Sequence, residues 1–333
     1  MGGLEMPRAI THYLFALDCL DILDSYTKNI INENYDMYIL GCQGPNFFNY
    51  YNDFSFFNNK NISQLSAIIH NKNINRFIKN MIMYSKNKEN LKYVFNDINF
   101  SNICISYIYG YLTHYILDKE SHPYIYNLQK NLRDKYKYKS SIALHKSIET
   151  HIDSLLLLKF KNLKPYEFKD YLNINLKNNE LLILSDMYSY LVCSVYNKNV
   201  SCNDIKKSFH TFKKVENKIN SSPNIISKIY LNIKNKTAKS SYIDNEVYSN
   251  YTHCINDLLN ERHNKWIDPF SKQESNQSYL DIYINSLKLY IDLINDLNLY
   301  LDCKISLSSL LLKLDNKSFL TNQNCNTDNV ISI

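Results

Sequence analysis

Residues 114–123 read His114-Tyr-Ile-Leu-Asp118-Lys-Glu-Ser-His122-Pro123, and after a lysine-rich gap residues 145–149 read His145-Lys-Ser-Ile-Glu149. In each stretch a histidine and a carboxylate stand four residues apart, a spacing that puts both side chains on one face of a helix. The two stretches therefore predict two helices that pack side by side and direct their His-carboxylate pairs toward divalent metal ions. Imidazole and carboxylate ligands without a thiolate favour zinc over manganese or iron.

Two other histidines extend the predicted site. His122 directly precedes Pro123, and a proline disfavours helical geometry in the residue before it. We therefore expect the His122 imidazole to leave the helix of His114 and to reach a second metal from a loop. His70 stands on an otherwise apolar helix face and is a further candidate ligand. A single His-carboxylate pair is more often a surface contact, but two pairs joined by a His-Pro step favour a metal site.

The rest of the chain predicts an all-α fold. The chain has 333 residues with five glycines and six prolines, and no low-complexity linker divides it. We expect one multi-helix domain over residues 1–315 and a polar, disordered tail over residues 316–333. We find no strand pattern and no apolar run suited to a membrane span. Apolar residues recur at helical spacing over residues 10–32, 64–84, 102–119, 140–160, 179–196, 202–218, 245–264, 278–301 and 306–314.

The charge pattern gives little indication of a nucleic-acid or membrane partner. The formal net charge is +6, but the lysines are scattered, and the densest run, from Lys130 to Lys139, lies between the two predicted ligand helices. This run favours a solvated connector, with transient contact to an anionic membrane surface as the alternative. Eight cysteines without a Cys-x-x-Cys spacing indicate reduced thiols. The opening segment lacks the apolar run of a signal peptide, so we expect a cytoplasmic protein.

In these motifs the sequence resembles the bacterial zinc-dependent phospholipase C family. The resemblance covers most of residues 6 to about 300 in the same order, with a weaker match at Glu261-Arg-His-Asn-Lys-Trp266. It implies an all-helical enzyme with a cleft that holds up to three zinc ions. The matching stretches are Pro7-Arg-Ala-Ile-Thr-His12-Tyr-Leu-Phe15, Gly41-Cys-Gln-Gly-Pro-Asn46-Phe-Phe, Ile69-His70, Tyr109-Gly110-Tyr-Leu-Thr-His114-Tyr-Ile-Leu-Asp118, His122-Pro-Tyr-Ile125, and His145-Lys-Ser-Ile-Glu149 with Asp153.

The resemblance also implies which residues hold each ion. The positions that match the ligands of the first ion are His70, His114 and Asp118. The positions that match the ligands of the second ion are His122, His145 and Glu149. A third ion in the secreted members uses the position of His12, the shared aspartate and the amino group of an N-terminal tryptophan, which this chain lacks. We therefore expect two zinc ions, with His12 either binding metal in another way or lining the cleft.

One position departs from the family pattern. Family members usually carry an aspartate after the Gly-Pro step of the first loop, where it ligates the first metal and orients or deprotonates the attacking water. This chain has Asn46 there. An amide can coordinate through its carbonyl oxygen but carries no charge and accepts no proton, so metal affinity and water activation should both be reduced. Asp53, seven residues further on in the aromatic loop over residues 38–57, could compensate.

The function that the resemblance implies is hydrolysis of a phospholipid on the glycerol side of its phosphate. Two zinc ions can activate a water and bind the phosphate oxygens, so the catalytic group would be the metal-bound water rather than a side chain. The first-loop aromatics could line a substrate pocket or simply pack the loop onto the helices. Two alternatives stay open. Fungal single-strand nucleases share this metal cluster and fold, and a metal-stabilised helical protein without hydrolysis could serve as a binding or structural component.

Other residues are expected to have structural roles. His151 lies about 240° around the helix from His145 and should face solvent, whereas Asp153 should accept a hydrogen bond from a ligand imidazole. Gly110 indicates close packing of two helices, and Trp266 should anchor the later helices rather than contact substrate. The histidines with expected surface or structural roles are His210, His253 and His263.

Overall fold

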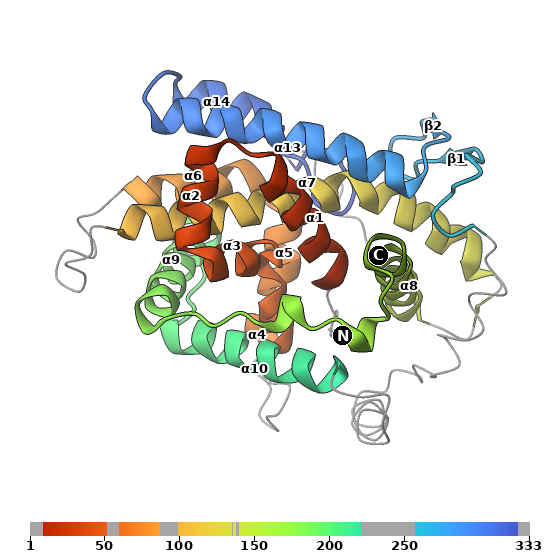
Figure 1. Cartoon of the computed structure of the whole chain (residues 1–333), viewed down its shortest axis with the longest axis horizontal. Coiled ribbons are helices and arrows are strands. Elements are labelled where there is room, and N and C mark those ends of the chain that lie inside the picture. Colours follow the sequence, from red (N-terminus) through yellow and green to blue (C-terminus); the bar gives the residue numbers. More distant parts are fainter. Residues whose placement is uncertain are drawn as a thin grey trace.

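The computed structural model describes residues 9–51, 60–86, 99–134, 136–137, 140–220 and 257–325. These residues are predominantly helical, which confirms the all-α prediction (Figure 1). The α-helices are α1 (Ala9–Ile22), α2 (Ser25–Glu33), α3 (Tyr35–Gly41), α4 (Lys60–Ser63), α5 (Leu65–Asn71), α6 (Ile74–Lys86), α7 (Phe100–Arg133), α8 (Ser141–Lys161), α9 (Asn178–Tyr196), α10 (Cys202–Asn220), α13 (Tyr279–Leu301) and α14 (Leu307–Lys313). Short 3-10 helices are η1 (Gly44–Tyr50), η3 (Pro165–Glu167) and η4 (Asp170–Leu172).

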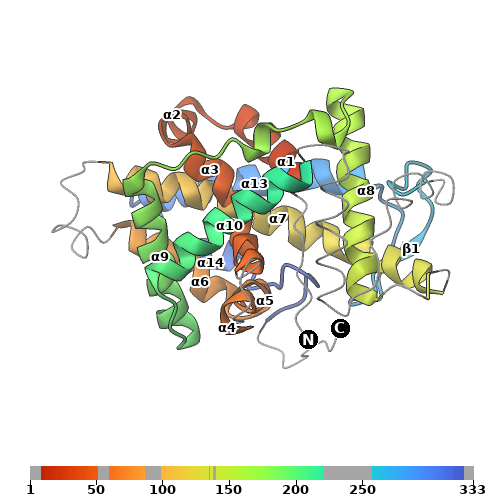
Figure 2. The ribbon, with the colours of Figure 1, turned by 90° about the horizontal axis from the view of Figure 1, so that it is seen from below.

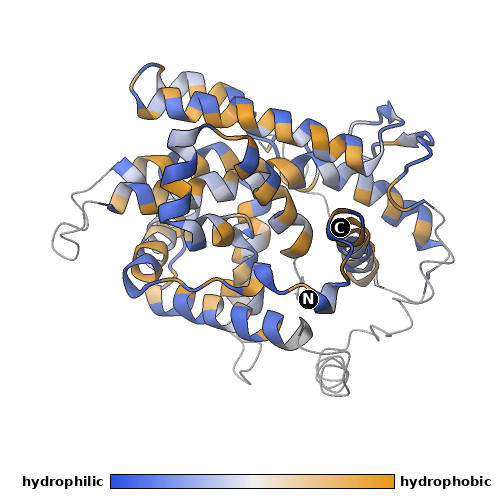
Figure 3. Ribbon diagram, in the orientation of Figure 1, coloured by the Kyte–Doolittle hydropathy of each residue, from blue (hydrophilic) through white to orange (hydrophobic). Residues whose placement is uncertain are grey.

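The long helix α7 is the centre of the fold. It has 34 residues, and every residue from Ile103 to Lys119 is buried. Helices α1, α3, α6, α8 and α13 all pack against it, and α8 crosses its C-terminal half (Figure 2). The outer helices carry hydrophilic and hydrophobic residues in alternation (Figure 3), as expected when only one face is buried. Because α7 is enclosed, the polar side chains in its middle lie inside the protein.

Two glycines allow α3 to lie directly against α7. A Cβ atom at Gly110 would be 2.0 Å from the carbonyl oxygen of Tyr38, and one at Gly41 would be 2.4 Å from that of Tyr107. Real side chains cannot approach a backbone oxygen so closely. The prediction of close helix packing at Gly110 is therefore confirmed.

Helix α7 continues through Pro123, so the expectation that His122 leaves the helix is wrong. A proline inside a helix removes one backbone hydrogen bond and costs about 3 kcal/mol. Burial of the following turn offsets this cost, since Tyr124 is 2% exposed and Ile125 is fully buried. Nδ1 of His122 donates to the carbonyl oxygen of Asp118 at 2.9 Å. His122 therefore projects from α7 itself, one turn after Asp118.

Two of the predicted long helices are each divided in two. Residues 10–32 form α1 and α2, because Asp24 accepts hydrogen bonds from the backbone N–H groups of Tyr26 and Thr27 and so begins a new helix. Residues 64–84 form α5 and α6, which are separated at Asn73, a residue with a left-handed φ of 55°. The predicted helices near α8, α9, α10, α13 and α14 are confirmed to within two residues.

The region before α13 differs from the prediction. Residues 245–256 of the predicted helix 245–264 lie outside the described residues, and residues 257–264 form turns. The side chain of Asp257 accepts from the backbone N–H groups of Glu261 and Arg262, which stabilises a turn in place of a helix. A short antiparallel hairpin follows, formed by β1 (Trp266–Ile267) and β2 (Glu274–Ser275). The expectation that the chain has no strand is wrong in this small respect.

The first part of the predicted disordered tail is packed against the domain. Phe319 is fully buried, and its backbone N–H donates to the carbonyl oxygen of His70 at 3.0 Å. A bridge pairs Lys317 with Asn324. Residues 326–333 lie outside the described residues, so the tail prediction is corrected for residues 316–325. Among the helices described, none is both long and apolar enough to cross a membrane.

Candidate metal centre

A first cluster of potential ligands lies where α1, α5 and α7 meet. His12 comes from α1, His70 from α5, and His114 and Asp118 from α7. All four are buried, His114 completely. Nε2 of His12 is 3.1 Å from Oδ1 of Asp118, and Nε2 of His114 is 3.2 Å from Oδ2. The predicted pair His114 and Asp118 on α7 thus faces His70 on α5, and His12 lies beside them.

The geometry of this cluster fits zinc. Nε2 of His70 lies 3.1 Å from Nε2 of His114 and 3.8 Å from Oδ2 of Asp118. The third distance, from Nε2 of His114 to Oδ2 of Asp118, is 3.2 Å. A triangle with these edges has a point about 2 Å from all three atoms, which is the length of a zinc–ligand bond. His12 approaches the other oxygen of Asp118. The two carboxylate oxygens of Asp118 thus face different imidazoles, and both would be available to hold metal.

The protonation states follow from the hydrogen bonds. Nδ1 of His70 faces the carbonyl oxygen of Ser66 at 2.7 Å, and because a carbonyl only accepts, the His70 proton is on Nδ1 and Nε2 is an acceptor. Nδ1 of His114 has no hydrogen-bond partner among the described residues. The His114 proton is therefore favoured on Nε2, between His70 and Asp118. A zinc ion bound at Nε2 of His114 would require the imidazole proton on Nδ1, which faces no described acceptor. The fit to a metal therefore rests on the distances given above.

Burial and mutual attraction set the charges of the first cluster. Burial holds the pKa of His114 well below its usual value, although Asp118 acts in the opposite direction. Burial alone would raise the pKa of Asp118, but the imidazoles of His114, His122 and His12 outweigh it and hold that pKa well below the usual range. An ionised carboxylate surrounded by imidazoles is a combination that binds a divalent cation.

A second cluster joins α7 to α8. Nε2 of His122 is 3.7 Å from Oε1 of Glu149, and Nε2 of His145 contacts the same oxygen. The two imidazole rings are parallel within 11°, with centroids 5.5 Å apart. His122 also lies near the first cluster, because its Nδ1 is 3.7 Å from Oδ1 of Asp118. The structure therefore brings together both predicted ligand sets, in adjacent positions along α7.

Hydrogen bonds orient the ligands of the second cluster. Nδ1 of His145 donates to Oε1 of Gln129 at 2.8 Å, and Nε2 of Gln129 donates to the carbonyl oxygen of Ser141 at 3.1 Å. Because that carbonyl can only accept, the Gln129 amide must present its oxygen to His145. Like His122, which donates from Nδ1 to a backbone carbonyl, His145 keeps the lone pair of Nε2 for a metal. Sequence reasoning missed Gln129, although its spacing of seven from His122 on one helix face could have indicated it.

Asn46 lies beside the first cluster. Its Oδ1 accepts a hydrogen bond from the Ser66 hydroxyl at 3.4 Å, and the same hydroxyl is 3.5 Å from Nδ1 of His70. Gly44, two residues earlier, has a φ of +57°, and a Cβ there would be 2.1 Å from the His114 ring. The glycine thus lets η1 approach the ligand closely. Asp53, the residue considered as a substitute carboxylate, lies outside the described residues.

The first-loop aromatics that the structure describes pack the core. Phe47 and Phe48 are fully buried, and their rings lie 5.1 Å and 5.4 Å from that of Tyr188. This supports the packing interpretation for these two residues over a substrate pocket. The remaining phenylalanines of the loop lie outside the described residues and are Phe54, Phe56 and Phe57.

Phe319 covers the first cluster and was missed from sequence. Its ring centroid lies 4.8 Å from that of His70, 5.7 Å from that of His114 and 4.8 Å from that of Tyr115. The apolar pair Phe319-Leu320 within a polar segment was the signal that could have indicated a packed residue. The C-terminal segment therefore helps to close the first cluster.

Two residues on α8 differ from their predicted roles. His151 is buried at 6% exposure rather than facing solvent, because α8 packs against both α1 and α7. Asp153 accepts from the backbone N–H and the hydroxyl of Thr11 and from the N–H of Ile10, so it stabilises the N-terminus of α1, the helix that carries His12. It holds a ligand helix in place, a role that the prediction did not include.

The structure describes an anchoring role for Trp266 and exposed positions for two of the later histidines. Trp266 packs edge-on against Tyr124 with centroids 5.3 Å apart and donates from Nε1 to the carbonyl oxygen of Gln277, as expected for an anchor. His210 and His263 are exposed. His253 lies outside the described residues.

None of the family models, curated proteins or solved structures compared with the chain matches it. The resemblance described above therefore rests on the quoted motifs, and the function has to be argued from the two clusters.

Proposed function

We propose that this chain is a zinc-dependent phosphodiester hydrolase with a phospholipase C-like metal centre. The observation that carries the proposal is the position of Asp118, whose carboxylate lies within 4 Å of imidazole nitrogens of His12, His70, His114 and His122. A buried carboxylate among that many imidazoles is an arrangement that binds closely spaced cations. The second cluster begins at His122, one helical turn after Asp118 on α7.

Zinc ions held there would supply Lewis acidity and a water acidic enough to attack a phosphodiester near neutral pH. The side chains have distinct parts in this chemistry. Asp118 would supply negative charge to bound cations, while Ser66 and Gln129 fix the imidazoles of His70 and His145 so that Nε2 faces the centre. No nucleophilic serine or cysteine is needed.

Phospholipid is the substrate class that the resemblance favours, with attack on the glycerol side of the phosphate. Single-stranded nucleic acid is the alternative, because the same metal cluster serves both kinds of phosphodiester. Contact with a membrane surface would accompany the first of these.

A second candidate function is a metal-stabilised helical protein without hydrolysis. Two observations favour it. The resemblance matches Asn46 to the position where the family carries a water-activating aspartate, and the carbonyl oxygen of Asn46 already accepts a hydrogen bond from Ser66. Phe319 closes one side of the first cluster. Both would suit an ion bound for stability.

Hydrolysis of a bis-nitrophenyl phosphate tests the proposal. We expect turnover that disappears on chelation and returns with zinc, and that falls in Asp118→Asn but not in His263→Gln, an exposed histidine far along the chain. Zinc-loaded protein without turnover would contradict the proposal and favour the second candidate.

Asn46→Asp separates the two candidates further. The added carboxylate supplies a charge and a proton acceptor beside the first cluster, so zinc affinity and diester turnover should both rise, by about tenfold for one good charged interaction. An inert, equally zinc-loaded Asn46→Asp variant would mean that position 46 takes no part in activating water.

A further inference from the structure

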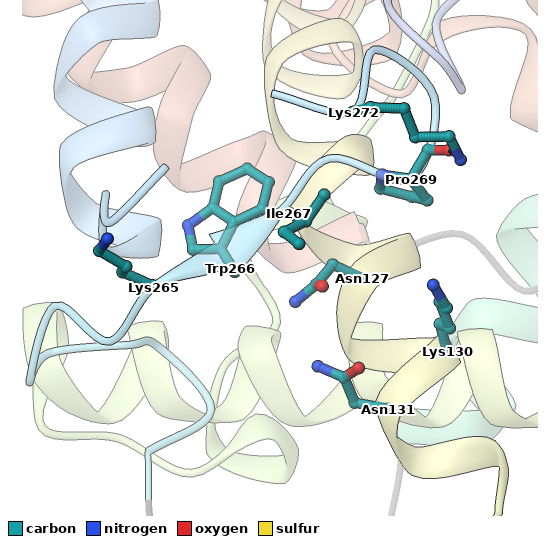
Figure 4. A pocket seen from close by; sticks show the side chains of 8 residues that line it. All are labelled: Asn127, Lys130, Asn131, Lys265, Trp266, Ile267, Pro269 and Lys272. Atoms are coloured by element: carbon teal, nitrogen blue, oxygen red, sulfur yellow. Dashed lines mark hydrogen bonds between the residues drawn. The ribbon is translucent and has the colours of Figure 1, made fainter. Parts of the chain in front are cut away.

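A pocket of about 260 Å³ lies beyond the second cluster, between the C-terminal part of α7 and the hairpin (Figure 4). Its lining contains no carboxylate. Trp266 contributes an aromatic wall. Three lysines and two asparagines contribute cationic and amide donors: Lys130, Lys265, Lys272, Asn127 and Asn131. Side chains of this kind, in a concave site, bind an anion and match the several acceptor oxygens of a phosphate.

The lysines of the pocket differ in their ion-pair and hydrogen-bond partners. Lys265 pairs with Glu274 at 3.5 Å, but both side chains are more than half exposed, at 82% and 66%, and such pairs contribute little. Lys272 donates to the carbonyl oxygen of Pro269 at 2.5 Å, a bond that leaves its charge uncompensated. Lys130 has no carboxylate partner among the described residues. The pocket therefore keeps most of its positive charge.

The pocket and the second cluster both lie along the C-terminal half of α7. His122, Tyr126 and Lys130 follow one another at intervals of four residues, so Lys130 lies about 12 Å beyond His122 along the helix axis. Tyr126 bridges this interval. Its ring centroid is 4.7 Å from that of His145 and 5.2 Å from that of Phe270, which follows the pocket residue Pro269.

We infer that this pocket binds a second, uncleaved phosphate of the substrate whose scissile phosphodiester lies at the metal clusters. The inference rests on the proposed function and, of the two substrate classes considered there, selects a single-stranded oligonucleotide over the phospholipid that the resemblance alone favours. A strand carries phosphates at regular intervals, whereas phosphatidylcholine carries one. Its bases also stack on aromatic rings, and Tyr126 and Trp266 are both partly exposed between and beside the charged groups.

The test uses the zinc-loaded full chain and the variant Lys130→Ala/Lys272→Ala. Both lysines are exposed, so the substitutions should not affect folding. We expect the KM for a short thymidine oligonucleotide to rise about tenfold with kcat unchanged, and the salt dependence of binding to fall by about 0.7 per lysine in the logarithmic slope. Turnover of bis-nitrophenyl phosphate, which has one phosphate, should not change. Lys288→Ala, an exposed lysine on α13, is the matched control.

An unchanged KM for the oligonucleotide, or an equal rise for both substrates, would overturn the inference. If neither substrate is hydrolysed, the proposed function fails, and the pocket is tested separately by fluorescence anisotropy of a labelled oligonucleotide. About tenfold weaker binding in the double variant would still support the pocket, and unchanged binding would overturn it. Weaker binding only to phosphatidylserine vesicles would make the lysines a membrane contact and would also overturn the inference.

Discussion

The two histidine clusters share α7 but differ in their access to solvent. In the first, His12, His70 and His114 are 4%, 5% and 0% exposed, and Phe319 packs on two of the rings. In the second, His122 and Glu149 are equally buried, at 3% and 4%, and the difference comes from His145, whose side chain beside Tyr126 is 17% exposed. An enclosed ion stabilises the structure and supplies charge, whereas an ion that solvent can reach can also meet a substrate. We therefore expect metal at the first cluster to matter most for folding and metal at the second to matter most for substrate.

The clusters also differ in how they are supported. The first is assembled from three helices and the C-terminal segment, which are far apart in the sequence. The second depends on α7 and α8 alone and is oriented by Gln129 through Ser141. A substitution that affects one cluster and spares the other is the sharpest way to establish this difference.

The largest effect is expected for Asp118→Asn. The substitution removes the charge shared among His12, His70 and His114, and should eliminate the first ion while the second cluster retains zinc. Because zinc binding in small proteins contributes about 10–16 kcal/mol, the free energy of unfolding of the zinc-loaded protein should also fall by several kcal/mol. Zinc content by atomic absorption and urea unfolding measure both. Unchanged zinc would remove Asp118 from the metal site.

Phe319→Ala should destabilise the protein by about 3–5 kcal/mol, as expected for a fully buried phenylalanine. It should weaken zinc binding at the first cluster only, since the ring contacts His70 and His114. Phe319→Leu, which fills part of the volume, should recover most of the stability. Competition with a chromophoric chelator measures the two affinities, and an equal loss at both clusters would mean that the residue has no specific relation to the first.

Gln129→Leu should have the opposite selectivity. Loss of the acceptor for Nδ1 of His145 should weaken zinc binding at the second cluster by about 10- to 100-fold and leave the first unchanged. Gln129→Glu keeps an acceptor oxygen and should retain most of the affinity. If both variants bind zinc as the wild type does, the hydrogen bond does not orient the ligand.

The smallest effect concerns pH in the metal-free protein. Burial lowers the pKa of His114 in the folded state, so the unfolded chain takes up its proton first, and stability that is complete above about pH 6.5 decreases as the pH falls. The pKa of Asp118 is also lowered, so its contribution is complete above about pH 3.9 and is lost on further acidification. Each group changes the free energy of unfolding by at most about 1.4 kcal/mol per pH unit. Urea unfolding of chelated protein from about pH 8 to about pH 4 measures the first decrease, and extension below about pH 3.9 measures the second. His114→Gln should lack the first decrease; its retention would assign that decrease to another group.

The sequence predicted the local parts of the site better than the distant ones. The pairs His114/Asp118 and His145/Glu149 followed from helical spacing, which is a property of one element. His122 was misplaced because the preference of the residue before a proline was outweighed by burial of α7 on both sides of Pro123. The breaks at Asp24 and Asn73 depend on a side-chain cap and on a left-handed residue, which apolar periodicity does not register.

The supporting residues were missed for a different reason. Gln129 and Phe319 act through contacts with other elements of the fold. Their residue types alone indicate nothing about metal binding. The contact of Asp153 with α1 was not predicted, since Thr11 lies 142 residues away from it. Long-range contacts of this kind depend on how the helices pack.

Anomalous diffraction at the zinc edge, from crystals grown with zinc, tests the central claim most directly. We predict one strong peak about 2 Å from the Nε2 atoms of His70 and His114 and a second about 2 Å from those of His122 and His145. A single peak elsewhere in the protein, or no peak at either cluster, would contradict a metal centre built on Asp118.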